Sequence, residues 1–202
     1  MYKIAITGKA NTGKNTVGKL LNKEIYSKEF QRTGKFTHNY RPKLLAFADP
    51  IKEMIQIAYP EIPRKWLYGP SKNRSQEIPG AFYQGKPLTV RQLLINLGND
   101  FGRANKPDIW LCNFDKRLEK TLKNPFTKIV IVPDCRFRNE FDHLKALGFY
   151  QIRLLRKDHT KIDDVSETNQ DGILDSEFDY VTHNDGTLKD LAQEVKKIVA
   201  QL

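Results

Sequence analysis

The sequence predicts an α/β fold of three layers, in which helices cover both faces of a mostly parallel, five-stranded sheet. Short apolar runs alternate along the 202 residues with segments whose apolar residues recur every three or four positions, the spacing of an amphipathic helix. Residues 129–132 read Ile-Val-Ile-Val, which is typical of a central parallel strand. The chain has the length of one domain, and 39% hydrophobic residues are enough for a core and exclude a disordered protein.

The N-terminal part of the chain shows two strand-to-helix successions. Residues 2–7 predict the first strand, and helical periodicity follows from Val17. We expect residues 26–42 to be irregular because they are polar, and residues 43–48 to form a buried strand. Asp49 then predicts the start of a helix, since aspartate is a good N-cap and the proline after it suits the first helical turn.

Residues 59–88 differ in kind from the rest of the chain. Five prolines and three glycines with interleaved aromatic residues predict an irregular excursion from the core, not a linker between domains. Thr89 is a good cap for the helix that follows, and we expect that helix to end at Gly98. We therefore interpret the whole chain as one domain with a substrate-binding excursion near residues 59–110.

The C-terminal half continues the alternation of helices and strands. Its predicted elements are a helix over 107–122, a helix over 137–147 ended by Gly148, strands over 149–155 and 178–182, and a final helix capped by Thr187. The residues between the last two strands are polar and acidic, and we expect a lid-like segment near residues 156–177.

The net charge of +10 favours anionic partners, namely nucleic acid, membrane surfaces or small phosphorylated molecules. Residues 1–150 carry +14 and residues 151–202 carry −4, and no run of five or six basic residues occurs. A basic sleeve for nucleic acid is not expected to carry that acidic end. We therefore interpret the charge as a phosphate-binding cleft among solvating lysines, which disfavours nucleic acid.

Other features of the composition bear on location and assembly. The longest apolar runs are too short to cross a bilayer, and the first residues resemble a strand and not a signal peptide, so we expect no membrane partner. Cys112 and Cys135 match no metal or disulfide spacing, which favours a reducing cytoplasm. The helix faces show no clear apolar stripe for a dimer contact. The sequence therefore leaves the oligomeric state open between a monomer and a homodimer.

A phosphate loop is the strongest motif of the sequence. It fits the pattern G-x-x-x-x-G-K between a predicted strand and a predicted helix, and consists of Gly8, Lys9, Ala10, Asn11, Thr12, Gly13, Lys14, Asn15 and Thr16. Glycines let the backbone curl until several N–H groups and the helix N-terminus hold an anion, and Lys14 would reach the β- and γ-phosphates of a nucleotide. The position after the lysine usually carries a hydroxyl for Mg²⁺. Here Asn15 would offer its amide oxygen.

A second group of polar residues follows the strand at 129–132. Asp134 and Arg136 come after it, and ligands of open α/β sheets bind beyond the carboxyl ends of strands. Asp134 would hold Mg²⁺ or its waters, and Arg136 would clamp a transferring phosphoryl group. The alternative is that Asp134 only caps the next helix and that Arg136 is an exposed residue.

Several blocks together resemble the deoxynucleoside monophosphate kinases of the bacteriophage type, and the resemblance covers most of the chain. The blocks occur in the same order and comprise residues 8–16, 47–52, 90–94, 98–100, 103, 108–110, 132–140, 156, 166–167 and 184–188. The resemblance implies a P-loop NTPase fold and transfer of the γ-phosphoryl group of ATP, with Mg²⁺, to a deoxynucleoside 5′-monophosphate.

The resemblance also implies roles for individual residues. The loop binds ATP, while Lys14, Arg136 and Arg156 become catalytic candidates, with Arg156 at the start of a lid. The substrate-binding candidates are Asp49, Lys52, Arg91, Gln92, Gly98, Asp100, Arg103, Trp110, Arg136 and Glu140.

Alternatives remain for the function and for single residues. A P-loop kinase with another acceptor, phosphomevalonate or a polynucleotide 5′-hydroxyl, would share the loop. A basic nucleic-acid-binding protein would share the charge, and its binding would weaken steeply with salt. For two of the substrate-binding candidates the alternative is structural. Asp49 would then serve only as a helix cap, and Trp110, at helical spacing with Leu111 and Phe114, would be a core residue.

Overall fold

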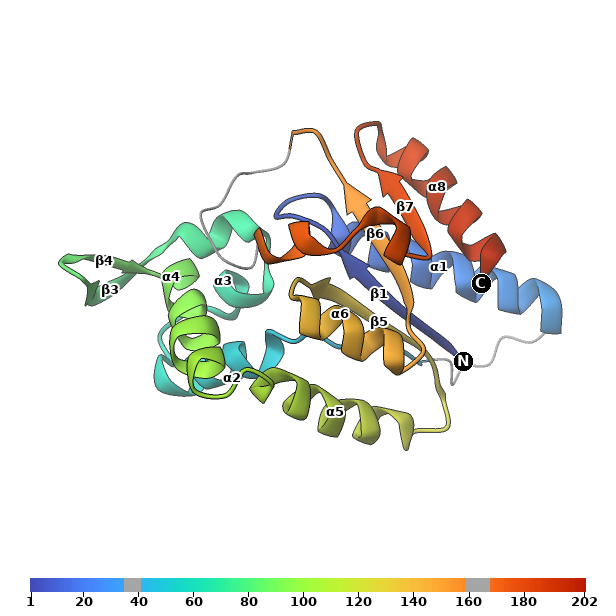
Figure 1. Ribbon diagram of the computed structural model, residues 1–202. Coiled ribbons are helices and arrows are strands. Elements are labelled where there is room, and N and C mark those ends of the chain that lie inside the picture. The colour runs from blue at the N-terminus through green and yellow to red at the C-terminus, as the bar shows by residue number, and fades with distance from the viewer. Residues whose placement is uncertain (35–40, 159–167) are drawn as a thin grey trace. The chain divides into compact units, whose positions relative to one another are not determined.

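The computed structural model describes residues 1–34, 41–158 and 168–202 (Figure 1). The chain forms two compact units in these ranges. Unit 1 comprises Met1–Ala46 and Asp115–Leu202, and unit 2 comprises Phe47–Phe114. Residues 166–167 of the family resemblance and the middle of the expected lid-like segment lie outside the described residues.

Unit 1 contains the predicted five-stranded sheet, and every neighbouring pair of strands is parallel. The spatial order is β2-β5-β1-β6-β7. The strands are β1 (Tyr2–Thr7), β2 (Arg41–Leu44), β5 (Thr127–Cys135), β6 (Tyr150–Leu155) and β7 (Tyr180–His183). Because the strands are parallel, their carboxyl ends lie at one edge of the sheet, and the chain leaves that edge at Gly8, Arg136, Arg156 and Asn184.

Helices cover the sheet on both faces, which confirms the predicted three layers (Figure 1). One face packs against α1 (Lys14–Thr33) and α8 (Leu188–Gln201), in a core that includes Ile4, Ile131 and Ile152 from the strands. The other face carries α6 (Arg138–Ala146), which buries Phe141 and Leu144. The alternation of side chains along each strand supplies both cores, as expected for a buried parallel sheet.

Helix α1 is longer than the sequence predicts. Residues 26–42 were expected to be irregular, but the helix continues to Thr33. Gly34 ends it in a left-handed conformation (φ 64°), and its N–H donates to the Phe30 carbonyl at 2.9 Å. The amphipathic pattern fades in the last turns because they are largely solvated, but Lys28 and Glu29 still hold them through bonds to the Val199 carbonyl and the Tyr2 hydroxyl.

Strand β2 and helix α2 (Asp49–Ala58) also differ from expectation. The strand spans Arg41–Leu44, earlier than the predicted 43–48, and beyond it the Leu45 N–H continues the ladder to the Ile131 carbonyl. The N-cap of α2 is Ala48, so Asp49 is not the cap but the first helical residue. There its carboxylate complements the helix dipole and pairs with Lys52.

Unit 2 is more regular than the prolines suggest. After α2 it contains α3 (Arg64–Tyr68), a 3₁₀ turn at Ser71–Ser75, and an antiparallel hairpin of β3 (Glu77–Tyr83) and β4 (Lys86–Thr89). Gln84 and Gly85 form the two-residue turn, and both have positive φ, which suits the twist of a hairpin. Sequence reasoning missed this hairpin, although a glycine between two short aromatic or apolar runs was a signal for it.

The helix after Thr89 does not end at Gly98. Thr89 caps α4 (Val90–Ile95) as predicted, and its Oγ1 accepts from the Gln92 N–H at 3.2 Å. The chain then continues as a π-helical segment over Asn96–Arg103 and, after a turn, as α5 (Ile109–Leu122). A Cβ at Gly98 would lie 3.2 Å from the Ile51 side chain, so the glycine serves close packing inside the helix. No helix in the described ranges is long and apolar enough to span a membrane.

Candidate functional site

The phosphate loop joins β1 to α1 in unit 1, as predicted. Its backbone turns through two left-handed positions, Asn11 (φ 60°) and Gly13 (φ 100°). The Thr12 hydroxyl donates to the Lys9 carbonyl at 2.9 Å and closes the turn. Helix α1 begins directly after Gly13, so its first N–H groups and its positive dipole end face the loop. This arrangement suits a phosphate group.

The Lys14 ammonium lies inside the loop that it follows. The residue is 9% exposed, and Nζ donates to the carbonyl oxygens of Gly8 and, at 2.6 Å, Lys9. These two bonds bring carbonyl dipoles to the buried cation, and an added anion would stabilise it strongly. The loop therefore provides a positive charge fixed in place for a phosphate.

Two glycines of the loop are required by space. A Cβ at Gly8 would lie 2.5 Å from the Leu154 carbonyl oxygen and 2.9 Å from Thr12 Oγ1. A Cβ at Gly13 would lie 2.5 Å from Asn184 Nδ2. All three distances are below van der Waals contact, so the glycines of the motif let β6 and Asn184 approach the loop.

A cavity of about 320 Å³ adjoins the loop within unit 1. Gly8, Lys9 and Thr12 line one side of it. The remaining lining comes from residues 153–157 at the end of β6, from Gln170 and Asp171, and from His183 at the end of β7. Arg156, predicted as catalytic, is thus at the cavity and exposed. The lining residues other than those of the loop and Arg156 were missed, although several follow strand ends.

Asp134 and Arg136 belong to the same edge of the sheet as the loop. The register pairs Cys135 with Thr7, so both residues flank the position opposite the end of β1. Asp134 is half-buried and Asn15 is exposed at the start of α1. The described residues include no cluster of three His, Cys, Asp or Glu side chains fit to hold a metal ion on its own. One carboxylate and an amide oxygen nevertheless suit Mg²⁺, which is usually held by one or two carboxylates plus the phosphates of its substrate.

Glu140, a predicted substrate-binding residue, is buried at the start of α6. It is 2% exposed, and its Oε2 accepts the N–H groups of Arg136 at 2.8 Å and Phe137 at 3.1 Å. The carboxylate therefore caps α6 and fixes the backbone of Arg136. Burial, reinforced by the charge of Glu140, raises the pKa of the Cys135 thiol well above its usual range, so this thiol stays neutral and unreactive.

Most substrate-binding candidates lie in unit 2, where several of them form ion pairs or hydrogen bonds with neighbouring side chains. Lys52 is 9% exposed, and its Nζ lies 3.2 Å from Asp49 Oδ1 and 5.1 Å from the centre of the Tyr68 ring. The Arg64 guanidinium lies 4.5 Å from the same ring. Sequence reasoning missed Arg64 and Tyr68, because cation–ring stacking leaves no spacing signal.

A second set of unit 2 candidates lies on α4 and the π-helical segment. Arg91 Nη2 donates to the Ser71 carbonyl at 3.1 Å and to its hydroxyl at 3.2 Å. The Gln92 amide donates to Asn96 Oδ1 at 2.6 Å. Asp100 is exposed and Arg103 half-buried on the π-helical segment. The bonds to Ser71 and Asn96 keep the Arg91 and Gln92 side chains in defined positions.

Trp110 is a core residue, which was the alternative to a base-binding role. It is 4% exposed, and its indole Nε1 donates to the Gly98 carbonyl at 2.9 Å. A Cβ at Gly102 would lie 2.5 Å from the ring, so the glycine at this position makes room for it. The ring therefore serves the packing of unit 2 and offers no free face to a base.

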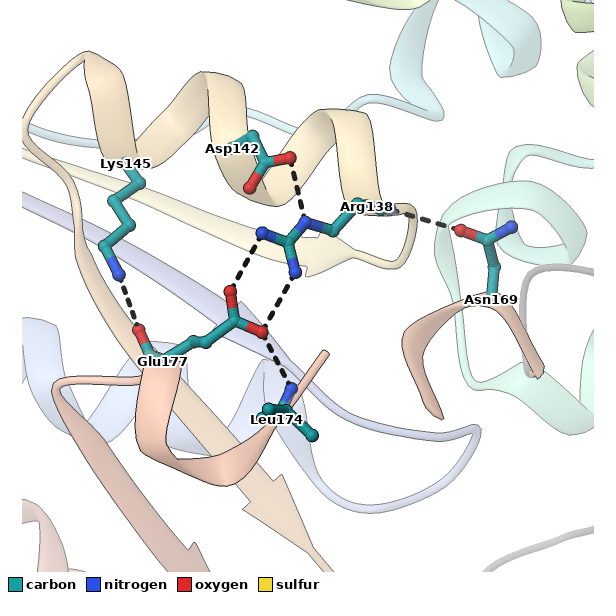
Figure 2. Close-up of polar contacts among 6 residues, drawn as sticks. All are labelled: Arg138, Asp142, Lys145, Asn169, Leu174 and Glu177. Atoms are coloured by element: carbon teal, nitrogen blue, oxygen red, sulfur yellow. Dashed lines mark hydrogen bonds and ion pairs between the residues drawn. The ribbon is translucent and has the colours of Figure 1, made fainter. Parts of the chain in front are cut away.

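An ion-pair network holds the segment after residue 168 against α6. Figure 2 shows the Arg138 guanidinium between two carboxylates, with Nε 2.8 Å from Asp142 Oδ2 and both terminal nitrogens within 2.9 Å of Glu177. Lys145 Nζ donates to the Glu177 carbonyl at 2.9 Å, and the Arg138 N–H donates to Asn169 Oδ1 at 3.2 Å. The same segment carries Asp171, whose carboxylate pairs with Lys9 of the phosphate loop at 3.0 Å.

Glu177→Gln is expected to lower the melting temperature at neutral pH by a few degrees, with the loss disappearing in acid. The Leu174 N–H first and the Arg138 guanidinium second hold the pKa of Glu177 below its ordinary value of 4.5. A lowered pKa contributes stability that is present above 4.5 and is lost as the pH falls through the folded value. Thermal denaturation of both proteins between pH 7 and pH 3 checks this, with Glu61→Gln as the exposed control. An unchanged difference at all pH values would contradict it.

Comparison with known proteins identifies the family of the chain. No curated protein matches the chain. Among solved structures, a gluconokinase from Sinorhizobium meliloti 1021 aligns at 16% identity and a TM-score of 0.47, over 99% of this chain and 92% of its own. The family model of deoxynucleotide monophosphate kinase matches residues 73–195, more than half of the chain. The chain therefore belongs to the deoxynucleotide monophosphate kinases, which phosphorylate deoxynucleoside monophosphates.

Proposed function

We propose that the phosphoryl donor is ATP, bound with Mg²⁺ at residues 8–16, and that ADP and a deoxynucleoside diphosphate are the products. The observation that carries this proposal is the buried Lys14 ammonium inside a glycine loop at a helix N-terminus, beside a cavity of about 320 Å³. Charge, helix dipole and backbone donors all favour a polyphosphate there. The family match covers residues 73–195, and the loop supports the donor independently of it.

The reaction needs alignment and charge neutralisation more than acid–base chemistry. A 5′-phosphate oxygen of the acceptor attacks the γ-phosphorus, and the bond to the β-phosphate oxygen breaks, so that the leaving oxygen stays on ADP. At neutral pH the attacking phosphate is largely dianionic and no side chain has to remove a proton. Mg²⁺, when bound, neutralises charge on the β- and γ-phosphates, and Asp134 and Asn15 would hold it or its waters.

In unit 1 we assign Lys14, Arg136 and Arg156 to the phosphoryl transfer. Lys14 neutralises charge that builds up on the β- and γ-phosphate oxygens. Arg136 leaves the sheet edge beside the loop on a backbone that Glu140 fixes, which supports a role in clamping the transferring group. Arg156 borders the cavity at the start of the lid-like segment, where it would contact the donor phosphates.

In unit 2 we assign the acceptor to the basic side chains. Lys52, Arg91 and Arg103 supply the positive charge for its monophosphate, and Arg64 beside Tyr68 adds to it. Gln92 and Asp100 supply hydrogen-bonding groups for the base or sugar. Both substrates of this enzyme are thus small phosphorylated molecules.

The test is a coupled assay of ADP release from MgATP against a panel of deoxynucleoside and ribonucleoside monophosphates. We expect turnover with at least one deoxynucleoside monophosphate, formation of the diphosphate in equal amount, and loss of activity on chelation of Mg²⁺. Phosphomevalonate and a 5′-hydroxyl oligonucleotide serve as acceptor controls. Turnover with either of these and with no deoxynucleoside monophosphate would contradict the proposal.

A further inference from the structure

Asn184 contacts the phosphate loop although 172 residues separate it from its partner there. It follows directly after β7, is 9% exposed, and its Nδ2 donates to the Thr12 carbonyl at 2.8 Å. The same nitrogen is the atom that a Cβ at Gly13 would approach to 2.5 Å. The Asn184 amide thus lies directly beside the Thr12–Gly13 peptide.

The backbone of Asn184 is fixed by a second bond. Its N–H donates to the Leu155 carbonyl at 2.8 Å, at the end of β6 and next to Arg156. The side-chain amide is therefore not at the tip of a free loop, since the last rung of the parallel sheet sets its position. Asn184 joins the phosphate loop to the strand end that borders the cavity.

A bond to the Thr12 carbonyl also orients the N–H of Gly13. The peptide bond is planar and trans, so a carbonyl and the N–H of the next residue point in opposite directions. Holding the Thr12 oxygen on the Asn184 side turns the Gly13 N–H to the other side. The Thr12–Gly13 peptide lies between two residues with left-handed backbones, Asn11 and Gly13. Such a conformation persists where surrounding contacts hold it, and the bond from Asn184 is one such contact on this peptide.

We propose that Asn184 is a positioning residue for the donor nucleotide, which it serves by holding the Thr12–Gly13 peptide so that the Gly13 N–H faces the phosphates. The inference rests on the proposed function, because the proposed function places ATP at this loop. It predicts an effect on the donor and none on the acceptor, since the bonds described here join Asn184 only to unit 1.

The decisive variant is Asn184→Asp, which keeps the shape of the side chain but places a carboxylate oxygen where the donor was. We expect the KM and the dissociation constant for ATP to rise about tenfold or more, the effect of losing roughly one hydrogen bond to a buried group. The KM for the acceptor should stay within about twofold of wild type on the same scale. Asn184→Ser, whose shorter hydroxyl falls short of Thr12, should shift the ATP constants in the same direction and guards against misfolding of the aspartate variant.

Thr182→Val is the matched control, because Thr182 is buried on β7, the strand that Asn184 follows, and its hydroxyl bonds weakly, at 3.4 Å, to Glu194. It should cost stability without raising the KM for ATP. An equal rise in both KM values, or a rise for ATP in Thr182→Val as large as in Asn184→Asp, would overturn the inference and leave the proposed function intact. A wild-type enzyme without turnover on MgATP would overturn both.

A measurement on the unmodified protein tests the contact itself. The Asn184 side-chain amide should show hydrogen exchange slower than the amides of exposed asparagines in nuclear magnetic resonance spectra, because it is buried and bonded. Its resonance should also shift when ATP is added. Exchange as fast as that of an exposed amide would overturn the inference, whatever the kinetics.

Discussion

Lys14→Met is expected to lower kcat by about 10²–10³-fold or more while the protein stays folded. Methionine has a similar length and fits the buried position, but it carries no charge and cannot donate to the phosphates or to the carbonyls of Gly8 and Lys9. The charge that builds up on the phosphate oxygens during transfer then loses the cation fixed inside the loop. Single-turnover kinetics with MgATP measure the loss, and circular dichroism checks the fold.

Lys19→Met is the control for that substitution, because Lys19 is exposed on the same helix α1. It removes the same net charge from the protein and should leave kcat and the KM for ATP nearly unchanged. A folded Lys14→Met enzyme with wild-type kcat would show that residues 8–16 are not the donor site. A nucleic-acid-binding protein would also tolerate this substitution, so the variant separates the two functions directly.

Gly8→Ala is expected to destabilise unit 1 by about 3 kcal/mol, which corresponds to a fall in melting temperature of roughly 6–12 °C. The new methyl group would meet the Leu154 carbonyl oxygen at 2.5 Å, and this atom belongs to the backbone of β6. A flexible side chain could turn away, but a strand in the middle of the sheet can move only by weakening its bonds to β1 and β7. Thermal or urea denaturation measures the effect.

Gly172→Ala is the matched control for the effect of an added methyl group. Nothing lies within 4 Å of the position that its Cβ would take, and its backbone is not left-handed. We therefore expect a change close to zero or slightly favourable, since alanine restricts the unfolded chain. If Gly8→Ala proved as stable as Gly172→Ala, the close approach of β6 to the loop would be wrong.

Local signals in the sequence were enough for the elements whose cause is local. The β-branched run at 129–132 gave a central parallel strand, Thr89 and Thr187 both cap helices through their hydroxyls, and Gly148 ends α6 with φ 75°. Each of these depends on a residue and its neighbours within one turn or one strand. The phosphate loop belongs to the same class, because strand, glycines, lysine and helix are contiguous.

Predictions failed where the pattern was ambiguous or the cause was distant. The prolines of residues 59–88 predicted an irregular segment, but part of it forms a hairpin whose turn has positive φ at Gln84 and Gly85. Gly98 looked like a helix stop, yet its carbonyl accepts the Trp110 indole and its missing Cβ admits Ile51. A glycine that serves packing inside a helix looks the same in the sequence as one that ends it.

The sequence by itself determined the alternation of strands and helices, the phosphate loop and the convergence of Asp134 and Arg136 on its edge of the sheet. These follow from side-chain periodicity and from the rule that parallel strands end together. Only the tertiary structure decided which polar residues support the site and which support the fold. Glu140 became a helix cap, Trp110 a core residue and Asn184 the clamp on the loop, because burial and a hydrogen-bond partner far along the chain leave no trace in local spacing.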